Sequence, residues 1–170
     1  MVRLILALVD IMLHRRGPDS LPSSPFLFWL LLAAMLASEF TLLALVGITV
    51  PKTVVMLLVM GFEFWFVWAV LFLFERQRRF RQTMSAVLGT DAILAVATIP
   101  LVPFAEPAAA SQQFSPAEIA ALVLQVWSIL ILAFVLSRAV DRPYLLTLAV
   151  SIAYVFLMLI FRGAILPRPA

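Results

Sequence analysis

The sequence is short of several residue types on which protein chemistry often depends: its 170 residues include no cysteine, one histidine and five glycines. The lack of cysteine excludes disulfides, thiolate-bound metals and thiol catalysis. With His14 as the single histidine, the chain cannot carry an HExxH zinc motif, which needs two histidines on one helix face. No glycine-rich stretch has the pattern of a phosphate-binding loop. We therefore expect no metal, no other cofactor and no enzymatic activity.

Charged side chains are also scarce. They make up 12% of the residues, against about 25% in a typical soluble domain, and hydrophobic residues make up 65%, against about 45–50%. At a mean hydropathy of +1.13 the chain has too little polar surface to coat a water-soluble globule. The composition thus predicts an integral membrane protein and, at this length, a single small helical domain.

Five nearly uncharged stretches account for most of the chain. A helix rises about 1.5 Å per residue, so about 20 residues cross the ~30 Å hydrocarbon core of a bilayer. Each stretch reaches this length. We therefore predict an all-α fold, a polytopic membrane protein with five transmembrane helices. The predicted spans cover about residues 25–48, 52–74, 84–104, 117–140 and 144–166.

Two span starts carry helix-capping signals. Ser24 precedes Pro25, and a proline is favoured at the first helical position. Ser115 precedes Pro116 and is followed three residues later by Glu118, which is the spacing of a capping box. These signals indicate that helices begin at the residues after Ser24 and Ser115.

Residues 1–16 precede the first span and have a different pattern. The apolar run Leu4–Val9 is short, Asp10 interrupts it, and no small-residue cleavage site follows, so it is unlike a signal peptide. Arg3, Asp10 and His14 are spaced 7 and 4 apart, which places them on one face of a helix. The segment is therefore predicted to be a short amphipathic helix in the membrane interface.

The basic residues predict an orientation, because cytoplasmic loops are enriched in Arg and Lys. Three basic residues, Lys52, Arg162 and Arg168, fall on one side of the five spans. Abundant arginine, alanine, leucine and proline with a single lysine is typical of a GC-rich bacterial genome. We thus predict a bacterial inner-membrane protein with a cytoplasmic N-terminus and a periplasmic C-terminus. The other nine basic residues fall on the predicted cytoplasmic side: Arg3, Arg15, Arg16, Arg76, Arg78, Arg79, Arg81, Arg138 and Arg142.

Three carboxylic acids, Glu39, Glu63 and Asp91, lie inside predicted spans. By helical rise the two glutamates lie about 18–21 Å from the cytoplasmic boundary and Asp91 about 10 Å. An ionised side chain at the bilayer centre costs at least ~2.5–3.5 kcal/mol, so burial favours the neutral acid. No basic residue inside the spans is available to pair with them. They form either a proton, cation or substrate site, or hydrogen-bonded contacts between helices worth about 0.6–2 kcal/mol each.

Two stripes of small and polar residues point to the same interior. Ala121, Gln125 and Ser128 share one helix face, and Thr147, Ser151 and Tyr154 share another. Such stripes are typical of close helix packing in membranes, and ligand contact is the alternative. The candidate intramembrane polar cluster is Glu39, Glu63, Asp91, Gln125, Ser128, Ser151 and Tyr154.

The connection between the second and third spans is strongly basic. Arg76, Arg78, Arg79 and Arg81 lie within six residues, and each arginine near a membrane surface attracts anionic lipid headgroups by about 1 kcal/mol. Much of this charge is the orientation signal itself. We expect contact with the bilayer and its anionic headgroups, and the loop is also a candidate surface for a membrane-protein partner or a second copy of the chain. The positive charge does not indicate nucleic acid.

The order of these elements, with the segment Arg15–Pro22 before the first span, resembles small bacterial members of the Yip1 family. The likeness is carried by Arg79–Pro100 (RFRQTMSAVLGTDAILAVATIP) and by Val126–Arg162, which includes Arg138 and Arg142. The resemblance implies a polytopic membrane protein without known catalysis. Eukaryotic relatives are associated with vesicle trafficking and small GTPases, but this sequence lacks their long soluble N-terminal extension, so that role does not carry over.

Two functional hypotheses follow. The first is a non-enzymatic scaffold or accessory subunit that acts through helix contacts and its basic loop. The alternative is a small proton- or ion-coupled transporter, alone or as an oligomer, that uses the intramembrane carboxylates. Exchanging Glu39 and Glu63 for glutamine distinguishes them, because the amide keeps hydrogen bonding but cannot titrate.

Overall fold

The structure is a computed structural model that describes residues 2–104 and 115–165. Within these ranges every regular element is helical. Five of the helices are long and apolar enough to cross a membrane, as the sequence predicts. The elements are α1 (Val2–Met12), η1 (Pro18–Ser20), α2 (Pro25–Val46), α3 (Val50–Leu73), η2 (Gln77–Arg79), α4 (Phe80–Thr98), η3 (Ile99–Phe104), α5 (Pro116–Val140) and α6 (Tyr144–Ile165).

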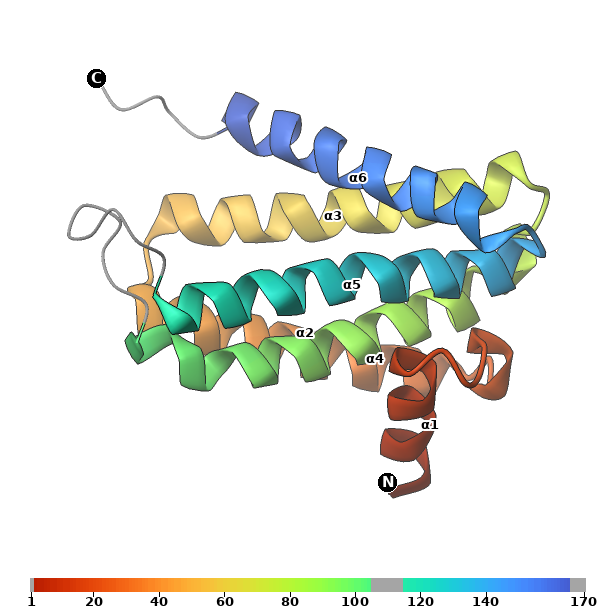
Figure 1. The fold of residues 1–170 in the computed structure, drawn as a ribbon, viewed down its shortest axis with the longest axis horizontal. Helices are drawn as coiled ribbons and strands as arrows, with labels where there is room; N and C mark the ends of the chain where they lie inside the picture. The colour runs from red at the N-terminus through yellow and green to blue at the C-terminus, as the bar shows by residue number, and fades with distance from the viewer. Residues whose placement is uncertain (1, 105–114, 166–170) are drawn as a thin grey trace.

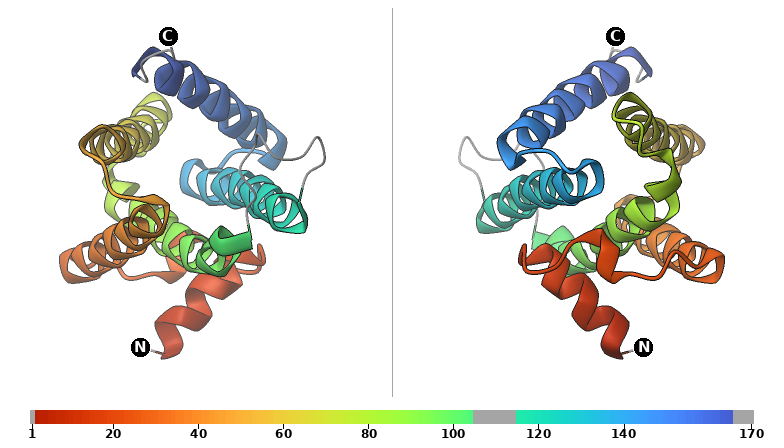
Figure 2. Two further views of the ribbon diagram at one scale, coloured as in Figure 1. Left: turned by 90° about the vertical axis from the view of Figure 1, so that its left-hand side faces the viewer. Right: turned by 90° about the vertical axis from the view of Figure 1, so that its right-hand side faces the viewer.

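The five long helices α2 to α6 run side by side in alternating directions (Figure 1). Helix α4 is central, because it packs on α2, α3 and α5, while α6 packs on α5 and α3. Views along the bundle show α2 next to α4 and α3 next to α6 (Figure 2). Helices α2 and α3 are thus consecutive and joined by a short connection, yet each packs mainly on other helices, α2 on α4 and α3 on α6 and α4.

The helix ends follow local chemistry. Helix α3 begins at Val50, two residues before the predicted start, because the Thr49 hydroxyl caps it by accepting a hydrogen bond from the Lys52 N–H (3.4 Å). Helix α4 ends at Thr98, and the chain continues as the 3-10 turn η3, which contains Pro100 and Pro103. Proline has no amide donor for the α-helical pattern, which explains the early end.

The capping box predicted before the fourth span is confirmed. The Ser115 hydroxyl accepts a hydrogen bond from the Glu118 N–H (3.2 Å), and the Glu118 carboxylate accepts one from the Ser115 N–H (2.7 Å). Two of the amide donors that a helix leaves unpaired at its start are thereby satisfied.

The apolar side chains divide into an inner and an outer set. Every residue from Thr83 to Thr90 of α4 is buried, which makes this helix the core of the bundle. Large apolar side chains such as Trp29, Leu145 and Phe156 are exposed on the outer faces. Helices that are apolar on all sides are typical of membrane spans, whose outer faces contact lipid.

The N-terminal helix α1 is shorter than predicted. It ends at Met12 because the chain turns at His14, whose φ is 59°, and the Arg15 and Arg16 amides bond back to the Asp10 carbonyl. The prediction that Arg3, Asp10 and His14 share one helix face is therefore wrong for His14. Asp10 instead forms an ion pair with Arg16 (3.2 Å).

Helix α1 lies across α4 and α5 rather than along them (Figure 1). Its side chains Leu8 and Ile11 are buried against the bundle. Two polar contacts fix its end to α5: the His14 ring lies 3.1 Å from the Leu130 carbonyl, and the Trp127 indole donates to the Met12 carbonyl (3.3 Å). The predicted position of this helix in the membrane interface stays a prediction.

The crossing of α1 over α4 depends on Gly89. A Cβ added to Gly89 would lie 2.6 Å from Leu8 Cδ2, whereas one added to Gly61 of α3 would meet nothing within 4 Å. We expect Gly89→Leu to displace α1 and to lower stability by about 1–3 kcal/mol, while Gly61→Leu leaves stability unchanged or improved.

The measurement uses the absence of natural cysteine. Ile11→Cys, buried in the native chain, should react with a maleimide much faster when combined with Gly89→Leu than when combined with Gly61→Leu. Equal reactivity in the two backgrounds would show that α1 does not depend on this crossing.

Candidate functional site

A cavity of about 350 Å³ lies between α2, α3, α4, α5 and α6, and acidic, amide and hydroxyl groups are among the residues that line it. All three carboxylic acids found inside the predicted spans line it: Glu39 from α2, Glu63 from α3 and Asp91 from α4. Each is half-buried. Three separate helices thus bring their acidic residues to one space.

Glu63 and Asp91 are in direct contact. Their carboxyl groups lie within hydrogen-bonding distance of each other. A hydrogen bond between two carboxyl groups requires a proton on one of them, since an ionised carboxylate only accepts. Glu63 of α3 and Asp91 of α4 therefore bring two acidic groups together across the boundary between these helices.

Most of the remaining candidate residues complete the same wall. Gln125 and Ser128 of α5 line the cavity, and the Gln125 amide donates to the Ser128 hydroxyl (3.2 Å). Tyr154 of α6 lines it too, and its ring packs on Phe66 with centroids 4.6 Å apart. Ser151 is fully buried but is not part of this wall, and its hydroxyl has no hydrogen-bond partner among the described residues.

Arg162 is a candidate site residue that the sequence analysis missed. It was placed at the exterior end of the last span, but the structure puts it in the wall of the cavity, close enough to Glu39 for their charges to attract. The prediction that the carboxylates have no basic neighbour is therefore wrong. The signal was present in the sequence: Arg162 follows Tyr154 by eight residues, which places both on one helix face.

A second cavity of about 360 Å³ lies between α2 and α3. Its wall shares four residues with the first cavity: Met35, Glu39, Glu63 and Arg162. The two glutamates and the arginine therefore stand at the boundary between an interior polar space and a space between two spans.

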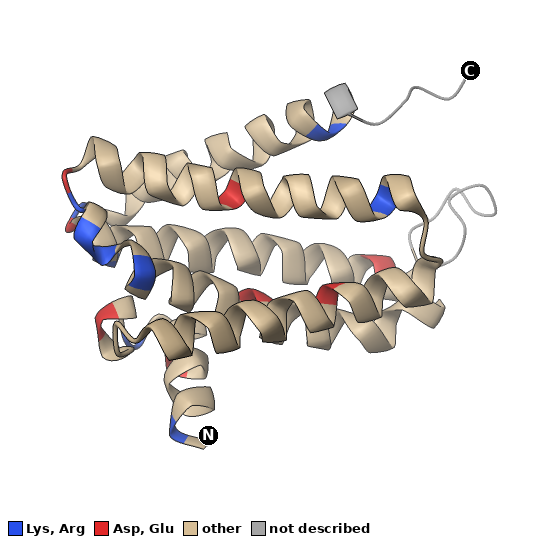
Figure 3. Cartoon of the chain, turned by 180° about the vertical axis from the view of Figure 1, so that it is seen from behind, with Lys and Arg blue, Asp and Glu red and all other residues tan. Residues whose placement is uncertain are grey.

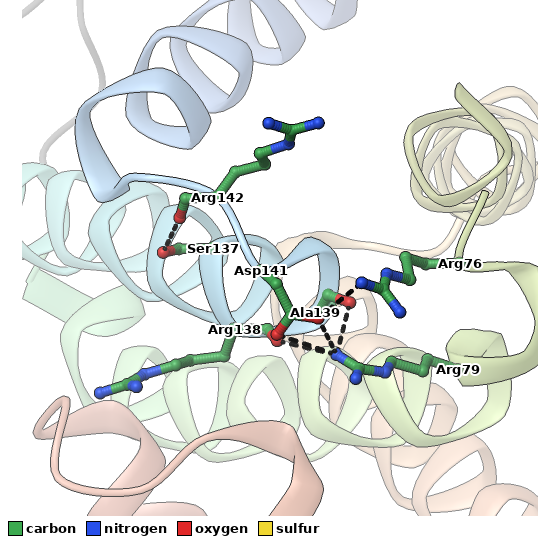
Figure 4. A network of polar contacts seen from close by, with 7 residues as sticks. All are labelled: Arg76, Arg79, Ser137, Arg138, Ala139, Asp141 and Arg142. Atoms are coloured by element: carbon green, nitrogen blue, oxygen red, sulfur yellow. Dashed lines mark hydrogen bonds and ion pairs between the residues drawn. The ribbon is translucent and has the colours of Figure 1, made fainter. Parts of the chain in front are cut away.

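The predicted basic loop is divided by the structure into two parts. Arg76 and Arg79 both form ion pairs with Asp141, at 3.1 Å each (Figure 4). Arg79 also donates to the carbonyls of Ala139 (3.0 Å) and Arg138 (3.3 Å), at the end of α5. These two arginines thus tie the α3–α4 connection to the α5–α6 connection.

The other two arginines of the loop, Arg78 and Arg81, are exposed, and the side chain of neither forms an ion pair or hydrogen bond within the described part of the chain. Basic positions gather at the end of the bundle that carries these connections (Figure 3). Among the candidate lipid or partner contacts, Arg78 and Arg81 therefore keep side chains available at the surface.

The described residues hold no group of three or more His, Cys, Asp or Glu side chains arranged to bind a metal ion. Searches against protein-family models, curated proteins and solved structures find no match to this chain. The resemblance to the Yip1 family therefore stays a prediction.

The Arg79 contacts give a stability prediction with a matched control. Arg79→Ala removes a charged donor from two carbonyls and from Asp141, and should destabilise the bundle by about 1–3 kcal/mol. Arg78→Ala, one residue away and exposed, should stay within about 0.5 kcal/mol of the parent. Asp141→Asn should cost less than about 1 kcal/mol, because the carboxylate is half exposed.

The three variants can be compared by reversible unfolding in detergent micelles. If Arg79→Ala and Arg78→Ala unfold at the same denaturant concentration, the contacts in Figure 4 do not hold the two connections together.

Proposed function

We propose that this chain is a small, non-enzymatic, multi-pass membrane protein that carries protons or another cation through its interior cavity. The observation that carries the proposal is the convergence of Glu39, Glu63 and Asp91, from three helices, on one cavity that also contains Arg162. Action as an oligomer is compatible with the small size of the bundle.

The size of the cavity supports transport over a purely structural role. Carboxyl groups that only hold helices together would be enclosed in close helix contacts. A space of about 350 Å³ has room for on the order of ten water molecules. The carboxyl groups therefore adjoin a space in which ions or solutes can be hydrated.

The contact between Glu63 and Asp91 supports proton coupling. Uptake or release of their shared proton changes the charge of the cavity wall by one unit, close to Glu39 and Arg162. A charge change of this kind alters the affinity of the cavity for any charged solute. Intramembrane acids that face a cavity are typical of proton relays.

A scaffold or accessory role is the second candidate. The exposed Arg78 and Arg81 favour it, because unpaired guanidinium groups at a membrane surface attract anionic headgroups or an acidic patch on a partner protein. The Yip1 resemblance is compatible with this role. Both roles share the proposed location in the bacterial inner membrane.

The proposed orientation has the N-terminus in the cytoplasm and the C-terminus outside. It is supported by the basic positions that gather at one end of the bundle (Figure 3). The connection from α1 to α2 lies at the same end (Figure 1). Arg168 lies outside the described residues.

Transport can be tested in vesicles that contain the purified protein and an internal pH-sensitive dye. Glu63→Gln and Asp91→Asn should each reduce proton flux at least about tenfold, the scale of the loss of one essential proton carrier. Glu75→Gln, an exposed exchange in the α3–α4 connection, should leave flux unchanged. If all three variants conduct equally, the cavity carboxyls only hold helices and the scaffold role is favoured.

The orientation can be tested with single cysteines in the cysteine-free chain. In intact cells a membrane-impermeant thiol reagent should label Ile48→Cys, in the α2–α3 connection, and not Arg78→Cys. Permeabilised cells provide the control, in which both positions react. The opposite labelling pattern would invert the proposed orientation.

A further inference from the structure

Helix α1 lies on the outside of two helices whose other sides line the interior cavity. It runs across α4 and α5 (Figure 1), and views along the bundle show it on the side away from α3 and α6 (Figure 2). Both helices contribute to the cavity wall, α4 through Thr90 and Asp91 and α5 through Ser128 and Ile131. Helices α4 and α5 also pack on each other. Helix α1 therefore bridges, from outside, two adjoining parts of the cavity wall.

The contact with α4 is a close fit at one glycine. Leu8 is 3% exposed, and its Cδ2 atom would lie 2.6 Å from a Cβ added to Gly89. Asp91 follows Gly89 by two residues, which is a rotation of about 200° around a helix. Leu8 thus packs on one side of α4, and Asp91 lines the cavity on the other.

The contact with α5 is made by two polar interactions. The Trp127 indole donates a hydrogen bond to the Met12 carbonyl (3.3 Å), and the His14 ring lies 3.1 Å from the Leu130 carbonyl. Trp127 and Leu130 do not line the cavity, whereas Ser128, which lies between them in sequence, does. One short helix and the turn that follows it thus hold the outer sides of both α4 and α5 at the level of the cavity.

Few interactions keep α1 docked. Its outer side chains Val2, Ile5 and Leu6 are 71%, 55% and 57% exposed, so the helix is apolar on both sides. In a membrane, burial of apolar side chains between helices provides little driving force, because lipid tails are as apolar as the bundle. The docked position of α1 therefore depends on the close fit at Gly89 and on the two polar contacts with α5.

We propose that α1 is a strap over the cavity: while docked it holds α4 against α5, and when released it lets the two helices separate and the cavity widen. The inference rests on the proposed function, whose rate it places under the control of α1. Asp91 and Ser128 stand on the two helices that α1 bridges, so separation of these helices widens the cavity between them. The strap contacts none of the three carboxyl groups that line the cavity, and acts only on the helices that carry them.

Weakening the strap should increase transport. Leu8→Ala removes the side chain that packs on Gly89 and should raise proton flux into vesicles at least about fivefold, the factor that loss of one packing contact gives in a two-state equilibrium. Leu6→Ala, an equal truncation on the exposed side of α1, should leave flux unchanged. Trp127→Phe removes the donor to the Met12 carbonyl and should also raise flux. Unchanged or lower flux in both Leu8→Ala and Trp127→Phe would overturn the strap.

Fixing the strap with a disulfide should have the opposite effect. A Cβ added to Gly89 would lie 3.3 Å from Leu8 Cγ, so cysteines at both positions can reach the Cβ separation of about 3.5–4.5 Å found in disulfides. In the otherwise cysteine-free chain, Leu8→Cys with Gly89→Cys should conduct at least about fivefold less when oxidised than when reduced. Leu8→Cys alone should respond to neither treatment. Equal flux in the oxidised and reduced double variant would contradict the proposal.

Access to the cavity wall provides a readout that does not depend on transport. In a Ser128→Cys background, Leu8→Ala should speed labelling by N-ethylmaleimide at least about fivefold relative to Leu6→Ala, because α4 and α5 separate. Val59→Cys, in the cavity between α2 and α3, should react equally in both backgrounds, which excludes general unfolding. If Ser128→Cys also reacts equally in both, α1 does not hold the cavity wall together.

Failure of the strap and failure of transport give different results. Proton flux that depends on Glu63 but does not respond to Leu8→Ala, to Trp127→Phe or to the disulfide rejects the strap and keeps the proposed function. Labelling of Ser128→Cys that depends on Leu8, in a protein that conducts no protons, keeps the strap and rejects proton transport.

Discussion

The hydrocarbon core of a bilayer offers no hydrogen-bond partner, and this constraint determines which polar groups the fold tolerates and where they lie. Backbone groups are satisfied within helices, and helix starts by caps such as the Ser115–Glu118 box. The three carboxylic acids in the spans are not satisfied by the hydrogen bonds of their own helices or caps. They are instead brought to one interior cavity, where each faces polar neighbours and Glu63 contacts Asp91. The polar cavity is thus the structural consequence of placing acids in the spans.

Helix α4 makes this convergence possible, because within the described residues it packs on α1, α2, α3 and α5. Its small residues permit close approach: Gly89 leaves room for Leu8 on the outer side. Two residues along, Asp91 faces the cavity. A single turn of α4 therefore carries both the contact with the N-terminal helix and a residue of the cavity wall, so that a change at Gly89 acts close to Asp91.

The sequence predicts the parts of this structure that depend on local chemistry. The presence of five long apolar helices follows from hydropathy, and the structure confirms it, while proline and capping account for several helix ends. The end of α1 at Met12 was missed because it depends on a turn at His14, which contacts Leu130 far along the chain. Arg162 was missed because counting distance from the helix end ignores which face a side chain occupies. The convergence of the three acids also depends on how each helix is rotated about its own axis, which a hydropathy pattern does not predict.

The two ends of the bundle differ in how firmly they are tied. At the basic end, Arg79 and Asp141 join two connections, and Gln82 donates to the Leu21 carbonyl at 2.6 Å. At the other end, among the described residues, Lys52 bonds only to nearby carbonyls of its own connection. The proposed transport requires the cavity to open to each side in turn, and helices separate most readily where cross-links are few. Because α2 and α3 are already apart at that end, we expect their relative movement to expose Glu39 and Glu63 there first, with the basic end acting as the fixed support.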